Sequence, residues 1–222
     1  MSKIERKERE KQLRRESILD AAESVFFEKG LIASTMDEIA EKAELSKGTL
    51  YLYYRSKDDL YLGVICRGFD ILIIKLNESV SPNVSTIQKL LNIGSAYYNF
   101  SQKHTHYFRM FSFLESPQFH TMASEELLNE SHNQSKRAWD VIIDVISNGI
   151  KDGTFRENID PVQMAIILWL NATAIMKLKD RKDQFWIENL NVDVDTILQK
   201  SNAMLVSTML TENAKRYYQP KL

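Results

Sequence analysis

LSKGTLYLYYRSKDDLY, residues 45–61, is the stretch of sequence that decides the fold. It holds four of the chain's nine tyrosines, lysines on both sides of them, and Gly48 near its start. On a helix that begins at Lys47, Leu50 and Tyr54 lie four residues apart and therefore share one face. We expect these two side chains to pack inward, which leaves the opposite face and the N-terminal tip of the helix exposed.

The sequence before this stretch has the pattern of two further helices. Apolar residues recur at helical spacing over residues 16–29, and Gly30 follows as a left-handed stop. Thr35 and Glu38 stand three apart, as in a capping box, and predict the start of a second helix that ends near Ala43. The three helices have the layout of a helix-turn-helix, which many helical proteins show by chance.

The rest of the chain is also helical in pattern, so the predicted fold class is all-α. The expected helices lie at about residues 58–78, 84–102, 107–114, 124–151, 161–179 and 193–216. The longest uncharged apolar stretch, residues 161–176, is shorter than the ~20 residues that span a bilayer. We interpret it as a buried helix of a protein without a membrane segment.

Composition excludes several classes of protein. The chain has 222 residues, of which 44% are apolar and 27% charged, and only 7 glycines and 4 prolines, which favours long helices over a turn-rich sheet protein. Cys66 is the only cysteine, so an intrachain disulfide is excluded and a reducing cytoplasm is expected. The charged start of the sequence, MSKIERKEREKQLRRE, lacks the apolar segment of a signal peptide.

The net charge of −1 hides an uneven distribution. Residues 1–15 hold seven basic and three acidic side chains, whereas residues 16–44 hold two and eight. Residues 45–57 hold three basic side chains and no acid, so positive charge gathers around the quoted stretch. The basic N-terminal run fits a solvated helix end at least as well as an arm along a DNA backbone.

The exposed face of the third helix has the chemistry of a DNA-reading surface. It presents Lys47, Gly48, Thr49, Tyr51 and Tyr53. A glycine lets the backbone approach closely, a lysine donates to guanine or a phosphate, and a threonine methyl can touch a thymine methyl. Tyrosine hydroxyls reach phosphates without the entropy loss of a long side chain, and Lys57 suits a further phosphate. For each residue alone, an ordinary amphipathic helix with half-buried tyrosines explains the pattern nearly as well.

Three segments, taken together, resemble the N-terminal domain of the TetR/AcrR family of bacterial transcriptional repressors. They are ILDAAESVFFEKG, STMDEIAEKAELSKGTLYLYY and SKDDLY, and they follow one another at the spacing of that family between residues 11 and 61. Two positions depart from the commonest pattern: Tyr53 replaces a frequent histidine and Tyr54 a frequent phenylalanine. Beyond this segment the likeness is one of length and helical layout.

The resemblance implies a helix-turn-helix DNA-binding domain at residues 1–57 and a larger helical ligand-binding and dimerisation domain at residues 58–222. The implied contacts to double-stranded DNA come from Thr35, Met36, Ser46, Lys47, Gly48, Thr49, Tyr51, Tyr53 and Lys57. Two copies would read a palindrome, and the two long C-terminal helices would form a four-helix bundle between the chains. The implied function is that of a cytoplasmic repressor, which leaves its operator when a small-molecule effector binds.

Residues 97–113 concentrate seven aromatic side chains, two histidines and a methionine. One interpretation is a pocket for an apolar or aromatic ligand, and packing around a helix junction explains most of these residues equally simply. The candidate pocket residues are Tyr98, Phe108, Phe111, Trp139 and Trp169. His104 and His106 fit surface histidines better than a metal site, so neither a metal nor a cofactor is predicted.

Two other classes of function are weighed against a DNA-binding regulator. An enzyme is disfavoured because the sequence lacks a Ser-His-Asp order, a phosphate-binding loop and a dinucleotide fingerprint. A helical protein-interaction module whose N-terminal domain no longer binds DNA remains open. Binding to the DNA upstream of its own gene would distinguish a regulator from such a module.

Overall fold

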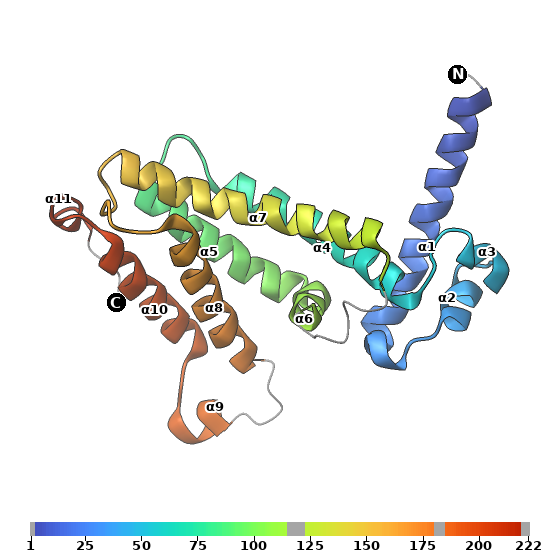
Figure 1. The fold of residues 1–222 in the computed structure, drawn as a ribbon. Coiled ribbons are helices and arrows are strands. Elements are labelled where there is room, and N and C mark those ends of the chain that lie inside the picture. The colour runs from blue at the N-terminus through green and yellow to red at the C-terminus, as the bar shows by residue number, and fades with distance from the viewer. Residues whose placement is uncertain (1–2, 115–122, 180–184, 219–222) are drawn as a thin grey trace. The chain divides into compact units, whose positions relative to one another are not determined.

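The computed structural model describes residues 3–114, 123–179 and 185–218, and within these residues it is helical with no strand. The all-α class is therefore confirmed. In chain order the helices are α1 (Lys3–Ala33), α2 (Met36–Lys42), α3 (Lys47–Tyr51), α4 (Lys57–Ser79), α5 (Thr86–Lys103), α6 (Thr105–Phe113), α7 (Glu125–Lys151), α8 (Pro161–Lys179), α9 (Phe185–Leu190), α10 (Val194–Met209) and α11 (Glu212–Lys215) (Figure 1).

The chain divides into two compact units, and the divisions fall inside α4 and α7. Unit 1 consists of residues 1–71 and 105–135, and unit 2 of residues 72–104 and 136–222. These units follow packing, whereas the division expected from the sequence separates the DNA-binding helices at residue 57 from the rest. That functional division stays a prediction.

The helix boundaries differ from the expected ones in several places. α3 ends at Tyr51 instead of continuing to Tyr54, and α9 was not expected. α1 begins at Lys3 rather than near residue 16, because the basic segment continues the helix as an exposed extension. Gly30 is left-handed, with φ 74°, and interrupts α1 as expected, but helical residues resume up to Ala33. The last helix is split at Leu210, whose extended backbone pairs with Phe155 while both side chains are fully buried.

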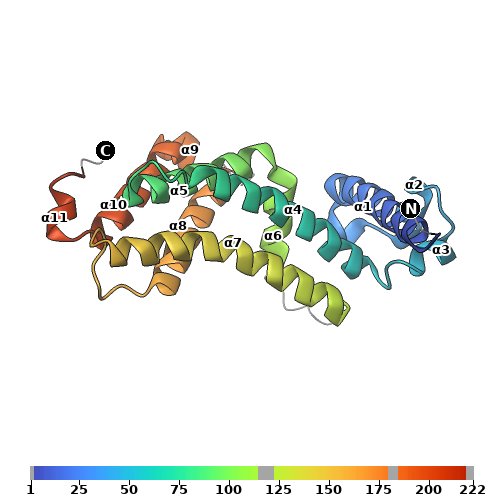
Figure 2. The same cartoon turned by 90° about the horizontal axis from the view of Figure 1, so that it is seen from above.

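The core of unit 1 gathers the inward faces of its short helices. α2 packs on both α1 and α3, as Figures 1 and 2 show. The predicted apolar face of α1, which includes Ile18 and Phe26, is buried, as is Ile39 of α2. The Phe26 ring meets the Tyr61 ring of α4 edge to face, with 5.2 Å between centroids. The start of α4 thus belongs to the same core as the helix-turn-helix.

An arginine of α4 binds three acidic side chains of α1. The guanidinium of Arg67 lies 2.5 Å from Glu16, 2.8 Å from Asp20 and 3.3 Å from Glu23. Glu23 also accepts a 2.7 Å hydrogen bond from the hydroxyl of Tyr107 on α6. Burial alone would lower the pKa of Arg67, but the hydrogen bonds to Glu16 and Asp20 and the charges of these two carboxylates raise it. α1, α4 and α6 are therefore connected by one polar network.

Unit 2 is built on the mutual packing of α5, α8 and α10, which lie side by side in both views (Figures 1 and 2). The buried residues of α8 are Met176 and three small ones, Ala165, Ala172 and Thr173. Its large apolar residues face outward, with Leu170 52% and Val162 49% exposed. Burial of the whole helix within its own chain is therefore excluded, because the chain covers only one side of it. That a second copy covers the other side, as the resemblance implies, stays a prediction.

By length and composition, α8 is also the one helix of the described residues that could cross a membrane, and 22% of its apolar window is buried. A single helix of this kind is weak evidence for a membrane span.

The Arg67 network should contribute measurably to stability. Because Arg67→Met removes several charge-assisted hydrogen bonds from a largely buried group, we expect the free energy of unfolding in urea to fall by about 1–3 kcal/mol. Arg6→Met is the control, since Arg6 and Glu10 form an exposed pair worth roughly 0.5 kcal/mol or less. Equal stability of the two variants would contradict a structural role for the network.

Candidate nucleic-acid interface

The start of α2 is fixed by the predicted capping box. The backbone of Thr35 is extended, its hydroxyl accepts a hydrogen bond from the Glu38 amide, and the Glu38 carboxylate accepts one from the Thr35 amide. Lys29 of α1 reaches the same carboxylate at 2.6 Å. Hydrogen bonds from Lys29 and Thr35 lower the pKa of Glu38, so the cap remains charged. α2 is thereby aligned with the end of α1.

α3 is a five-residue helix that depends on its anchors, because a helix this short does not form alone. Ser46 caps it by accepting a 3.1 Å hydrogen bond from the Thr49 amide. Leu50 is fully buried and Tyr54 is 2% exposed, as the spacing predicts. The guanidinium of Arg15 also lies 5.3 Å from the centre of the Tyr54 ring. The orientation of α3 is thus fixed by one face and by its cap.

The opposite face of α3 is open to solvent. Lys47 and Gly48 are exposed, Thr49 and Tyr53 are half-buried, and Tyr51 is 43% exposed. The structure therefore brings together the five residues that were expected to line the outer face. A surface of this size is narrow enough for the ~12 Å major groove.

Lys47 is not free in this structure. Its ammonium group lies 2.7 Å from the carboxylate of Asp37, which is exposed at the start of α2. The hydrogen bond to Asp37 raises the pKa of Lys47. Asp37 was not among the residues expected at this surface, because an acid ten residues before a lysine, across a tight turn, gives no distinctive signal. A phosphate or a guanine would have to compete with this carboxylate for Lys47.

Two further predicted contact residues lie deeper than expected. The side chain of Met36 is buried in the core, so a DNA contact of this residue could involve only its backbone. The ammonium of Lys57 donates hydrogen bonds to the backbone carbonyls of Ser34, at 2.7 Å, and Ile32, at 3.4 Å. Lys57 thus joins the start of α4 to the loop before α2, next to the Thr35 cap.

Among the residues that the structure describes, none requires a glycine at position 48. A Cβ atom built at Gly48 would meet one atom within 4 Å, the Ser46 hydroxyl at 3.9 Å, and the backbone is helical with negative φ. In a helix, glycine costs roughly 0.5–1 kcal/mol relative to alanine. An alanine would therefore fit this position of α3 without a clash among the described residues.

The candidate pocket residues do not form one cluster. Phe108 and Phe111 belong to unit 1, where Phe108 is buried and Phe111 stacks on Phe69 at 4.4 Å. Trp139 and Trp169 meet edge to face in unit 2, with centroids 5.4 Å apart. The hydroxyl of Tyr98 instead joins a polar cluster, as it donates to Asp195 at 2.7 Å and accepts from Lys179 at 2.8 Å.

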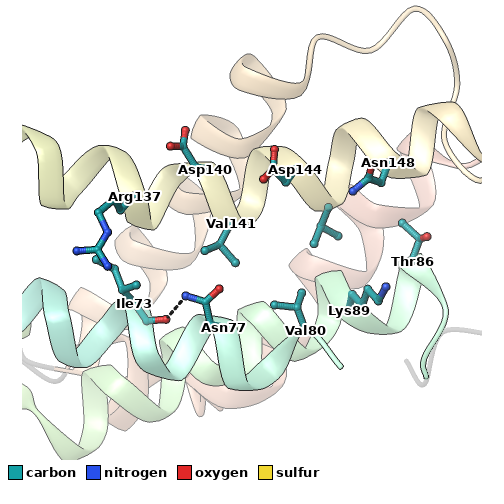
Figure 3. A pocket seen from close by; sticks show the side chains of 11 residues that line it. Ile73, Asn77, Val80, Thr86, Lys89, Arg137, Asp140, Val141, Asp144 and Asn148 are labelled. Atoms are coloured by element: carbon teal, nitrogen blue, oxygen red, sulfur yellow. Dashed lines mark hydrogen bonds between the residues drawn. The ribbon is translucent and has the colours of Figure 1, made fainter. Parts of the chain in front are cut away.

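A cavity of about 400 Å³ lies in unit 2 between the end of α4, the start of α5 and α7 (Figure 3). Val80 and Val141 line its apolar part, and Lys89, Arg137 and Asp144 carry charges around it. None of the five candidate pocket residues lines this cavity. Its polar residues had no motif in the sequence, because those of α7 come from a part of the chain far from the junction of α4 and α5.

Metal ligands are not grouped in the part of the chain that the structure describes: no three His, Cys, Asp or Glu side chains there lie close enough to hold an ion. His106 stacks on Phe27 with 4.6 Å between ring centroids, and His104 stacks on Phe100 at 5.3 Å. The two histidines thus belong to separate aromatic contacts.

Comparison with known proteins gives a consistent result. The family model of bacterial regulatory proteins of the tetR family matches residues 18–64. The transcriptional repressor KstR2 of Rhodococcus jostii is 31% identical over 153 residues, 66% of this chain and 70% of that protein. The transcriptional activator FasR of Mycolicibacterium smegmatis is 34% identical over 97 residues, 44% of each chain.

The fold of most of the chain is shared with solved structures. A crystal structure of the transcriptional regulator FadR from Bacillus subtilis, in complex with stearoyl-CoA, superposes with a TM-score of 0.66 at 18% identity. The match covers 87% of this chain and 98% of that one. The chain therefore belongs to the TetR family of bacterial DNA-binding transcriptional regulators.

Proposed function

We propose that this regulator is a homodimeric repressor, which holds a palindromic operator through the α3 helices of two copies and releases it when a small apolar or aromatic effector binds. The observation that carries the proposal is the outer face of α3. Leu50 and Tyr54 anchor the helix. On the opposite side Gly48 leaves the backbone uncovered, and the described residues give no cause for a glycine there. A duplex in close contact with α3 supplies that cause.

The proposed DNA contacts divide into two kinds. Gly48, Thr49 and Lys47 would face base edges, with Lys47 exchanging Asp37 for the duplex. Tyr51, Tyr53 and the capped start of α2 at Thr35 and Met36 would contact the sugar-phosphate backbone. Ser46 would hold the tip of α3, and Lys57 would add positive charge beside the cap. The functional head then consists of residues 1–57, and residues 58–222 bind the effector and the second copy.

Dimerisation is supported by the exposed apolar surface of α8 and α10. Four large apolar residues of α8 are 40–52% exposed, and Met204 of the adjacent α10 is 64% exposed. A second copy of the same surface would cover both helices, whereas a single head makes few base contacts and binds weakly. Two heads would read half-sites about 34–36 Å apart, or a multiple of that distance.

The effector class is suggested by relatives. KstR2 of Mycobacterium tuberculosis is described as a ketosteroid transcriptional regulator, and the structure of FadR contains stearoyl-CoA. An acyl or steroid skeleton would fit an apolar interior, and the cavity beside Val80 and Lys89 offers charges for a polar group of such a molecule. Release requires that the effector prefers the state that cannot hold DNA, since equal binding to both states changes nothing.

The route from the effector to DNA would run through α4. This helix leaves the head at Lys57, and Arg67 binds three acidic residues of α1. A tilt of α4 would therefore move α1 with it and change the separation of the two heads. Regulators of this family are generally non-enzymatic and cytoplasmic, and the same is proposed here.

The proposal is tested by selecting duplexes from a random library with the wild-type protein. We expect enrichment of a palindrome with a dissociation constant of about 10⁻⁸–10⁻¹¹ M. Stearoyl-CoA, a ketosteroid and an aromatic cation are then added separately, and one of them should raise the dissociation constant at least about tenfold, an ordinary allosteric coupling. If the protein enriches no sequence, it is instead a protein-interaction module whose N-terminal domain does not bind DNA. Increased transcription of a reporter by the bound protein would instead make it an activator.

Gly48→Ala should separate stability from DNA binding. We expect the free energy of unfolding to stay equal or rise by up to about 1 kcal/mol, because alanine favours the helix and meets no close neighbour. DNA affinity should nevertheless fall at least about tenfold, because the new methyl group stands between the backbone and the bases. Unchanged affinity, measured by fluorescence anisotropy, would exclude a close approach at Gly48.

Leu170→Glu should produce monomers. A charge in the centre of the apolar α8 surface would be buried without a partner in the dimer, and this costs several kcal/mol. Analytical ultracentrifugation should show the loss of the dimer, while circular dichroism stays unchanged because Leu170 is exposed in the single chain. Ile74→Glu, on an exposed part of α4, is the control that should leave the dimer intact. A dimeric Leu170→Glu protein would remove α8 from the interface.

A further inference from the structure

Leu52 is a large apolar residue that directly follows α3 and continues the face of this helix that is turned away from the core. It is 84% exposed, whereas Leu50, two residues earlier, is fully buried. Isolated exposed apolar side chains are common on protein surfaces, and Ile32 of the same unit is 82% exposed. Exposure alone therefore says little, and the position of Leu52 relative to its neighbours on α3 is what distinguishes it.

Leu52 shares a face with Gly48 and Thr49. Its backbone is still helical, with φ −73° and ψ −20°, and its amide donates a hydrogen bond to the Thr49 carbonyl. Residues three and four apart on a helix are neighbours, so Leu52 lies one turn beyond both Thr49 and Gly48. The bare backbone at Gly48 thus stands beside an exposed isobutyl group.

Apart from Lys47, which would have to exchange Asp37 for the duplex, this part of the surface offers apolar contact rather than hydrogen bonds. The Thr49 hydroxyl is already 2.8 Å from the Ser46 hydroxyl, and the Lys47 ammonium is paired with Asp37. Leu52 adds no donor and no acceptor. In the major groove, the one apolar group that a standard base presents is the 5-methyl group of thymine.

We propose that Leu52, beside Gly48 and Thr49, recognises the 5-methyl group of a thymine in each half-site of the operator. The inference rests on the proposed function, since it assumes that α3 enters the major groove. The missing side chain of Gly48 provides room for the methyl group, and the Leu52 side chain covers it from one side. Leu52 is then a specificity-determining residue that the pattern of charged and phenolic residues does not reveal.

The test removes the methyl group and the leucine separately. In the duplex that the wild-type protein selects, each symmetric pair of thymines is replaced in turn by deoxyuridine, which keeps the base pair and loses only the methyl group. One pair should weaken wild-type binding about fourfold per half-site, or about 15-fold for the dimer, as expected for one buried methyl group. Leu52→Ala should bind the thymine and deoxyuridine duplexes equally.

The matched control is Ile32→Ala, which removes a similarly exposed apolar side chain from the same unit and should retain the wild-type preference for thymine. Leu52→Ala is expected to fold normally, because Leu52 contributes little to the core, and its melting temperature checks this. If Leu52→Ala lowered the affinity for the thymine and the deoxyuridine duplex by the same factor, Leu52 would contact the sugar instead, and the inference would be overturned. So would a preference for thymine that survives in Leu52→Ala, or a wild-type protein indifferent to every methyl group.

These outcomes differ from a failure of the proposed function. If the wild-type protein enriches no sequence at all, the repressor proposal fails, and the thymine contact fails with it. If it enriches a palindrome but no deoxyuridine substitution changes its affinity, the repressor proposal stands and the role of Leu52 alone is wrong.

Discussion

The interface depends on the packing of two side chains, Leu50 and Tyr54, against the core of unit 1. A helix of five residues has no independent stability, so the orientation of α3 comes from these anchors and from the Ser46 cap. Every outward property of α3 follows from this constraint. If either anchor were moved by one position, the face that carries Gly48 and Thr49 would turn toward the protein.

The lysines around α2 and α3 are bound to partners within the chain and do not form a free basic patch. Lys47 is bound by Asp37, Lys29 by Glu38, and Lys57 by backbone carbonyls. The net charge of −1 is therefore a fair description of the free protein, because the exposed cations close to α3 are partly neutralised by partners within the chain. In the proposed complex these lysines would exchange intramolecular partners for phosphates and bases, so such a surface would rely on shape and on competition as much as on overall charge.

Local rules were sufficient where structure is local. The capping box at Thr35, the left-handed Gly30 and the inward pair on α3 follow from spacings of three or four residues, and the structure confirms them. Properties set by distant residues were not predictable in this way. The Asp37–Lys47 pair joins two helices, and the break at Leu210 depends on Phe155, which lies 55 residues earlier.

The outward face of α8 marks a different limit. Apolarity all round a helix indicates burial but does not say whether the same chain or another chain provides it. The aromatic residues of 97–113 were similarly ambiguous: an aromatic-rich segment fits a pocket as well as ordinary packing, and the structure distributes its rings between two units.

The central claim is that α3 presents its anchored helix to a duplex through the face that carries Gly48. A crystal structure of the dimer with its selected DNA tests this most directly. The account predicts that both α3 helices lie in successive major grooves on one side of the duplex, with the Gly48 backbone as the part of the chain nearest to the base edges. A complex in which α3 faces solvent, or in which another surface of unit 1 fills the groove, would contradict it.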